Sequence, residues 1–137
     1  MQYWLFKSEP FKWSWDQQVA ASVDHWDGVR NYQASNNMKA MKLGDRGFFY
    51  HSNEGKEIVG VVEVVREYYP DHTDAKGRFG MVDVKALHPL KTPVTLAQIK
   101  ADPELADIAL IKQSRLSVCP IKPDEWQYIC KLGGIDP

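Results

Sequence analysis

The feature that most constrains the fold is a succession of three predicted strands in the middle of the chain. Turn residues separate the segments Gly47–Ser52, Glu57–Tyr68 and Phe79–Leu87, which are rich in Ile, Val and aromatic residues. Residues 58–62 form an almost continuous apolar run, which is typical of a strand covered on both faces or lying inside a barrel. Because a parallel connection needs about a dozen residues or more, these strands follow one another too closely for a regular βαβ fold.

Shorter elements surround this central region. Hydrophobic periodicity and turn residues predict two outer strands and four short helices, over residues 2–7, 116–121, 15–23, 31–41, 96–101 and 123–132. Ser14 and Gln17 have the spacing of a capping box at the first helix start. The length of 137 residues fits one domain over residues 1–137. We therefore predict an α+β fold, a mixed or antiparallel β-barrel of five to six strands with short peripheral helices.

The charge balance excludes a nonspecific polyanion-binding protein. The net charge is −1, whereas proteins that coat duplex nucleic acid without sequence preference carry a large basic excess. Basic residues nevertheless cluster in two windows that contain no acidic residue, 28–44 and 108–123. If the windows meet in space they form one local positive face; otherwise they are two ordinary solvated faces.

Cysteine and histidine spacing argues against a metal centre. Cys119 and Cys130 match no zinc or redox motif, and the four histidines are scattered and supply no ligand pair. We expect reduced, partly buried thiols and neither a metal nor a cofactor. No segment approaches the run of about twenty apolar residues that spans a bilayer. The first ten residues lack the pattern of a secretion signal, so we expect a cytoplasmic location and no membrane partner.

Familiar catalytic and nucleotide-binding motifs are missing. The chain has no Gly-x-Gly-x-x-Gly, P-loop, Gly-x-Ser-x-Gly or His-Glu-x-x-His sequence. A Ser-His-Asp set can be assembled from Ser52, His51 and several aspartates, but nothing predicts a nucleophile on a strained turn. Lys7, Ser8 and Glu9 at the end of the first strand are the stronger candidates, since a desolvated lysine can act as nucleophile or base.

Four stretches combine planar, polar and basic side chains near strand ends and turns. They are Phe6–Pro10, Trp26–Gln33, Phe49–Ser52 and Arg115–Val118. The motifs that carry a family resemblance are YWLFKSEP at 3–10, WDGVRNYQA at 26–34, GD at 44–45, YHS at 50–52, RLSV at 115–118 and Trp126. Together they resemble the EVE family, a PUA-like group related to the YTH readers of methylated adenosine and to ASCH domains. The resemblance covers essentially the whole chain.

The resemblance implies a PUA-like barrel whose pocket binds a modified nucleobase in DNA or RNA, without catalysis. The candidate ligand-binding residues are Lys7, Ser8, Glu9, Trp26, Val29, Arg30, Asn31, Tyr32, Tyr50, His51, Ser52, Arg115, Leu116 and Ser117. A reader must take the base out of its stack, which favours single-stranded or distorted nucleic acid.

Several of these side chains suit base recognition by their chemistry. Trp26 and Tyr32 can form an aromatic cage, because stacking contributes about 1–3 kcal/mol per base. Asn31, Ser8 and Ser52 can donate to and accept from a Watson–Crick edge. The two arginines among the candidates can each contact a flanking phosphate through a bidentate fork.

Structural roles remain open for the same residues. Trp26 could instead plug the end of the barrel, where a large ring buries well. Arg30 could pair with Glu9 or Asp27 as a structural bridge rather than contact a ligand. His51 is more typical of a hydrogen-bonded residue at a strand end than of a catalytic base.

Two other functions stay open as well. Some ASCH-type relatives are amidohydrolases of modified cytidines, so Lys7, Ser8 and Glu9 could form a lysine-based hydrolytic site for a free nucleoside. The aromatic patch could also contact a partner protein, and we expect a monomer or a weak dimer.

Overall fold

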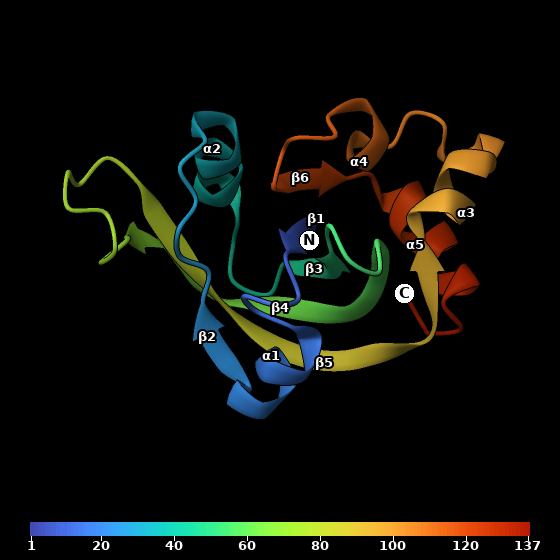
Figure 1. The fold of residues 1–137 in the computed structure, drawn as a ribbon, viewed down its shortest axis with the longest axis horizontal. Coiled ribbons are helices and arrows are strands. Elements are labelled where there is room, and N and C mark those ends of the chain that lie inside the picture. The colour runs from blue at the N-terminus through green and yellow to red at the C-terminus, as the bar shows by residue number, and fades with distance from the viewer.

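The computed structural model describes all 137 residues and shows a curved six-stranded sheet with helices around it (Figure 1). The strands are β1 (Tyr3–Ser8), β2 (Val23–His25), β3 (Arg46–His51), β4 (Glu57–Pro70), β5 (Gly80–Thr95) and β6 (Val118–Ile121). Their order is β2-β5-β4-β3-β1-β6, in which β1 and β3 are parallel and all other neighbours are antiparallel. The sheet is therefore mixed, and β2 and β6 form its edges.

Short helices cover the sheet, as predicted. They are α1 (Trp15–Ala21), α2 (Tyr32–Ala40), α3 (Leu96–Ala101), α4 (Ala109–Lys112), α5 (Pro123–Leu132) and the 3-10 turn η1 (Pro103–Leu105). The capping box of α1 is confirmed, since the side chains of Ser14 and Gln17 each accept from the other's backbone N–H. A membrane-spanning helix is not found among these elements. The structure confirms the predicted α+β class.

Aromatic side chains pack the last helix, α5, against strands β1 and β3. Trp126 of α5 is 1 % exposed and stacks on Phe48 and Tyr3, with ring centroids 3.9 and 4.4 Å away. Trp4 and Phe6 are also buried on β1. The helix thus holds β1 and β3 rigidly, so the residues at the ends of these strands have fixed positions.

The hairpin of β4 and β5 is longer than predicted. Its pairing continues beyond the predicted end at residue 87, and the register shifts several times along it. One shift lies beside Gly60, where a Cβ atom would be only 2.5 Å from the Trp15 ring. A glycine inside a strand often marks a bulge or a close approach of another group, and both are present here. Because Trp15 packs on the hairpin, α1 and the loop before it are fixed next to the end of β1.

Strand β2 was not predicted, and it positions the segment that follows it. The first helix ends two residues earlier than expected, and the chain then pairs antiparallel with β5, with Asp24 opposite Val84. The backbone N–H of Trp26 donates to the carbonyl of Val82 at 2.8 Å. Residues 24–28 therefore run along the sheet edge before they turn at Gly28, whose φ is +80°.

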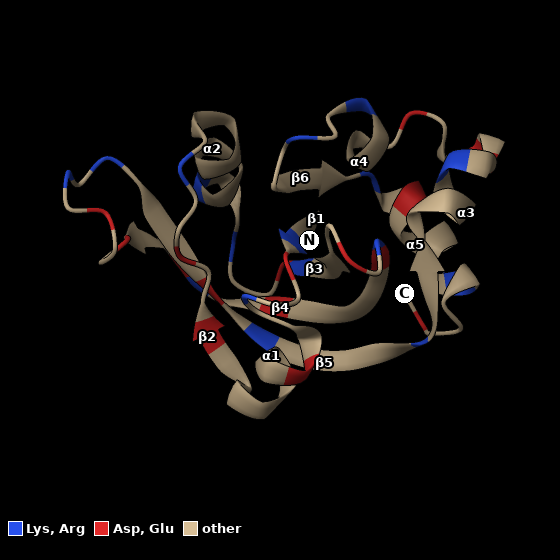
Figure 2. Ribbon diagram, in the orientation of Figure 1, with Lys and Arg blue, Asp and Glu red and all other residues tan.

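The two basic windows meet in the folded chain. The Gln33 amide donates to the Gln113 side chain at 2.6 Å, and the Asn37 amide donates to the Val118 carbonyl at 2.8 Å. Figure 2 shows basic residues on the loop before α2 and on the connection between α4 and β6. The hypothesis of one local positive face is consistent with this arrangement.

Candidate functional site

A pocket of about 590 Å³ lies where the end of β1 meets the segment that follows β2. It is lined by residues 7–9, 12–13 and 24–30 and by Ser117. This volume falls within the range of about 300–1,000 Å³ that is typical of small-molecule sites. Seven of the predicted ligand-binding residues line it: Lys7, Ser8, Glu9, Trp26, Val29, Arg30 and Ser117.

Trp26 is anchored in the core and contributes to the pocket wall. Its side chain is only 8 % exposed, and its ring packs edge-to-face on Phe6 and Phe49, with centroids 5.1 and 5.6 Å away. Trp26 therefore packs into this end of the core and also lines the pocket, where its role in binding a base stays a prediction. A ring held in this way loses little conformational entropy when a ligand binds.

A second indole, that of Trp13, lines the same pocket. Its Nε1 donates to the Gln18 side chain at 2.9 Å, and the buried Gln18 amide donates in turn to the Val84 carbonyl at 3.3 Å. The Ser8 hydroxyl donates to the backbone carbonyl of Trp13, which ties the loop to the end of β1. Since a hydroxyl has one proton, Ser8 can only accept from a ligand, not donate to it as well.

Lys7 lies between this pocket and a second one of about 400 Å³ that also includes Tyr50 and Ser52. Its ammonium group donates to the carbonyl of Ser114 at 2.9 Å, and no carboxylate lies within ion-pair distance. Burial lowers the pKa of Lys7, and the nearby Cys119 opposes that shift. Tyr50 and Ser52 therefore lie on the far side of Lys7 from the two indoles.

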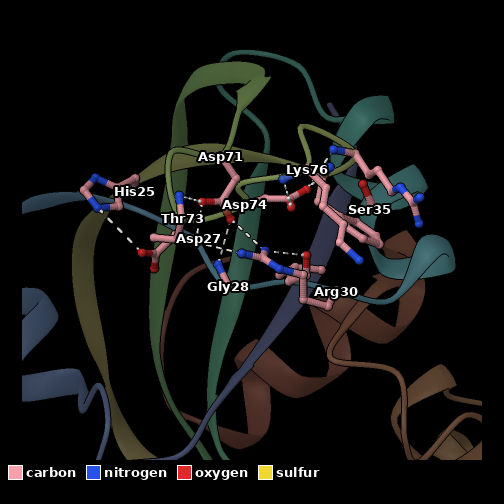
Figure 3. Close-up of polar contacts among 12 residues, drawn as sticks. His25, Asp27, Gly28, Arg30, Ser35, Asp71, Thr73, Asp74 and Lys76 are labelled. Carbon is pink, nitrogen blue, oxygen red and sulfur yellow. Dashed lines mark hydrogen bonds and ion pairs between the residues drawn. The ribbon is translucent and has the colours of Figure 1, made fainter.

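The buried carboxylate of Asp71 organises the loop at the other side of the pocket (Figure 3). It accepts from the backbone N–H of Gly28 at 2.8 Å, from the Arg30 guanidinium at 3.1 Å and from the backbone and hydroxyl of Thr73. Burial by itself would raise the pKa of Asp71, but these hydrogen bonds outweigh it and hold the pKa at about 2. The β4–β5 loop is thus tied to the segment that lines the pocket.

Arg30 pairs with this loop and not with the partners predicted from the sequence. Its guanidinium contacts Asp71 and donates to the Thr73 hydroxyl at 2.9 Å, whereas neither Glu9 nor Asp27 is an ion-pair partner. The reason is topological: the β4–β5 hairpin brings its loop back over the turn after β2. A phosphate would have to compete with Asp71 for this side chain.

Other predicted residues lie outside the pocket. Asn31, Arg115 and Leu116 line a separate hollow of about 330 Å³, and the Asn31 side chain caps α2. Tyr32 is 61 % exposed, and its ring lies 4.9 Å from that of Phe79, so it does not form the second wall of a cage here.

His51 has a structural role at this strand end. Its Nε2 accepts from the backbone N–H of Trp15 at 3.0 Å, and burial lowers the pKa of His51. This agrees with the interpretation of His51 as a hydrogen-bonded residue rather than a base.

Sequence reasoning missed several residues of the pocket: Lys12, Trp13, Asp24, His25, Asp27 and Gly28. The sequence feature that could have indicated these residues is Trp13, a tryptophan next to the helix-capping Ser14 and close to the end of a strand. The fold brings the rings of His25 and His72 to 4.8 Å. Their separation in the sequence gives no sign of that contact.

The sequence profile of the EVE domain family matches residues 2–132. The chain belongs to the EVE domain family. A similar solved structure is that of Rpa0253 from Rhodopseudomonas palustris, with 62 % identity, a TM-score of 0.92 and coverage of 98 % of this chain and 94 % of that chain. Thymocyte nuclear protein 1 of Rattus norvegicus is 35 % identical over 169 residues, which cover 98 % of this chain and 75 % of that protein.

One relative of this EVE domain has been solved with a nucleic acid. The human THYN1 protein, in complex with DNA containing 5-methylcytosine, is 33 % identical, with a TM-score of 0.91 and full coverage of both chains. A more distant likeness, to an ASCH protein of Zymomonas mobilis, has 12 % identity and a TM-score of 0.60. That likeness extends to the fold alone.

Proposed function

We propose that this EVE domain is a binding module that holds a modified nucleobase of DNA or RNA in the pocket lined by Trp13 and Trp26. The observation that carries the proposal is the pair of indoles, each fixed by contacts with the core, in one pocket of suitable volume. Flat aromatic faces suit flat bases, and stacking contributes about 1–3 kcal/mol per base. The human relative solved with methylated DNA supports the same ligand class.

Two acceptor groups of the pocket suit a base that offers an amino group. The Ser8 hydroxyl can only accept, and the carboxylate of Glu9 is also an acceptor. Cytosine and adenine present an exocyclic amine as donor, whereas guanine and thymine present carbonyl acceptors at the corresponding edge. Val29 adds an apolar surface that a methyl group can contact. We therefore propose 5-methylcytosine as the first base to test.

The flanking strand would lie where the two basic windows meet. Arg115 is exposed and lines the hollow beside α2, with no acidic partner. Because the pocket accepts a single unstacked base, we propose single-stranded or distorted nucleic acid as the substrate. The nearly neutral net charge predicts weak binding to unmodified strands.

Fluorescence polarisation with labelled single strands tests the proposal. Two otherwise identical DNA strands carry either cytosine or 5-methylcytosine at one position, and a matched RNA pair distinguishes the two nucleic acids. Trp13→Ala should weaken binding of the modified strand by about tenfold, which corresponds to about 1.4 kcal/mol. Phe11→Ala is the matched control, because Phe11 is an aromatic residue on the same loop, 68 % exposed and outside the pocket.

Trp26 needs a conservative change because its ring belongs to the core. Trp26→Phe keeps an aromatic side chain, and circular dichroism checks that the fold is intact. Equal binding of modified and unmodified strands, or unchanged affinity in both tryptophan variants, would refute the pocket assignment.

The half-buried Lys7 is the one observation that favours an enzyme. Its lowered pKa raises the share of neutral amine, but its ammonium group is held by the Ser114 carbonyl and no companion acid contacts it. We therefore propose binding without turnover. Incubation with N4-modified cytidines and mass spectrometry of the mixture tests this; a product that disappears in Lys7→Ala would establish the amidohydrolase instead. A cytoplasmic location remains a prediction, and similar proteins are named as nuclear.

A further inference from the structure

We infer that His25, Asp27 and His72 form a binding site for a divalent transition-metal ion at the edge of the pocket. One imidazole nitrogen from each histidine and one carboxylate oxygen lie within 4.8 Å of one another. His25 ends β2, Asp27 follows in the next turn, and His72 belongs to the β4–β5 loop. The site goes beyond the proposed function, because none of the contacts proposed for the base involves these three residues.

The side chain of His25 has the orientation expected of a metal ligand. Its Nδ1 lies 3.2 Å from the carboxylate of Asp24, and its Nε2 lies 3.9 Å from the carboxylate of Asp27 (Figure 3 shows the second contact). A carboxylate behind one ring nitrogen favours the proton on that nitrogen and leaves the lone pair of the other free. Metal-bound histidines almost always have such a partner on the second nitrogen.

The backbone that carries the other two ligands is held in place from both sides. Gly28, next to Asp27, donates to Asp71, which is next to His72. Asp71 also binds Thr73 on the other side of His72. Loop and turn are therefore fixed relative to each other, and most of the ordering that a metal site requires is already present.

The ligand types and their spacing suit zinc and its neighbours in the first transition row. Imidazole binds Zn²⁺, Ni²⁺ and Cu²⁺ well, and two histidines with one carboxylate leave a further coordination position open. Ligand atoms of a tetrahedral zinc ion are about 2.0–2.2 Å from the ion, and thus roughly 3.3 Å from each other. The three side chains are exposed, so small side-chain rotations can close the remaining gap.

Calorimetric titration of the metal-free, untagged full-length protein with Zn²⁺ alone tests the site, with Ni²⁺ as a second probe. We expect one equivalent to bind, and at least a tenfold loss of affinity in His25→Ala and in His72→Ala. His88→Ala is the matched control, since it also removes a histidine but lies outside the cluster. Asp24→Asn should weaken binding by about 10–100-fold, as loss of a carboxylate behind a ligand does elsewhere.

Nuclear magnetic resonance of the imidazole groups provides a measurement on the unaltered protein. Zn²⁺ should shift the signals of His25 and His72 and leave those of His51 and His88 unchanged. The inference is overturned if no Zn²⁺ binds, if affinity is the same in both alanine variants, or if the signals of other histidines shift instead. The wild-type spectra decide the question even if one variant fails to fold.

Discussion

Replacing Asp71 with asparagine tests whether its buried carboxylate organises the loop beside the pocket. Asp71 is 3 % exposed and accepts from Gly28, Arg30 and Thr73. Asparagine has nearly the same size and keeps one acceptor oxygen. Its NH₂ group, however, meets N–H donors where the carboxylate presents its second oxygen, so at least one buried donor loses its partner.

The lowered pKa of Asp71 gives the expected size of the loss in stability. The folded value is about 2 and the unperturbed value is 3.8. At about 1.36 kcal/mol per pKa unit, the difference of about 1.8 (3.8 − 2) corresponds to roughly 2 kcal/mol of stability. Because the folded value is the lower one, this contribution is complete well above the unfolded pKa of 3.8 and is lost as the pH falls toward 2.

Urea denaturation at pH 7 and pH 3 measures this contribution. Asp71→Asn should lower the free energy of unfolding by about 2 kcal/mol at pH 7 and by about half of that at pH 3. Asp107→Asn is the control, since Asp107 is 81 % exposed and contacts only Lys112, at 3.9 Å; it should leave stability unchanged. A loss below about 0.5 kcal/mol at pH 7, or equal losses at both pH values, would refute the reasoning.

Three further predictions concern packing and ionisation. Gly60→Ala places a Cβ atom 2.5 Å from the Trp15 ring, so overpacking should lower the free energy of unfolding by about 1–3 kcal/mol in the same urea assay; unchanged stability would contradict that contact. Burial and the hydrogen bond to Asp83 raise the pKa of Tyr69 to about 12, so an ultraviolet titration should include a tyrosine that ionises near pH 12, and the contribution of Tyr69 to stability should be lost as the pH rises from 10 through 12. Asp83→Asn should move that tyrosine to lower pH. Burial also raises the pKa of both cysteine thiols to about 11, so a thiol reagent should modify the native protein far more slowly than the urea-unfolded chain; equal rates would count against their burial.

The predicted and observed pockets differ because a sequence shows which side chains lie at strand ends, but not which ends meet. Lys7, Ser8 and Trp26 were predicted and line one pocket. Tyr50 and Ser52, predicted with them, lie across Lys7 in a second pocket. Parallel pairing of β1 with β3 sets these neighbours, and it depends on strand order, which no local pattern encodes.

The sequence by itself determined five of the six strands, the starts of the four longer helices and much of the core. Alternation, apolar runs and capping boxes are local, so Ser14 with Gln17 and the buried Trp4 and Trp126 follow directly from chain order. The motifs that carry the family resemblance are likewise short stretches of sequence, so they can be recognised without the structure.

Only the tertiary structure decided the partners of the polar side chains. Arg30 pairs with Asp71, and His25 meets His72, because the β4–β5 loop folds back over the turn after β2. The Trp13 ring is held at the pocket by its hydrogen bond to Gln18, whose amide donates to the Val84 carbonyl on β5. Ion pairs and hydrogen bonds depend on distances of a few ångströms in space, whereas the sequence gives only the separation along the chain. Residues that are far apart in the sequence are often neighbours in the folded structure.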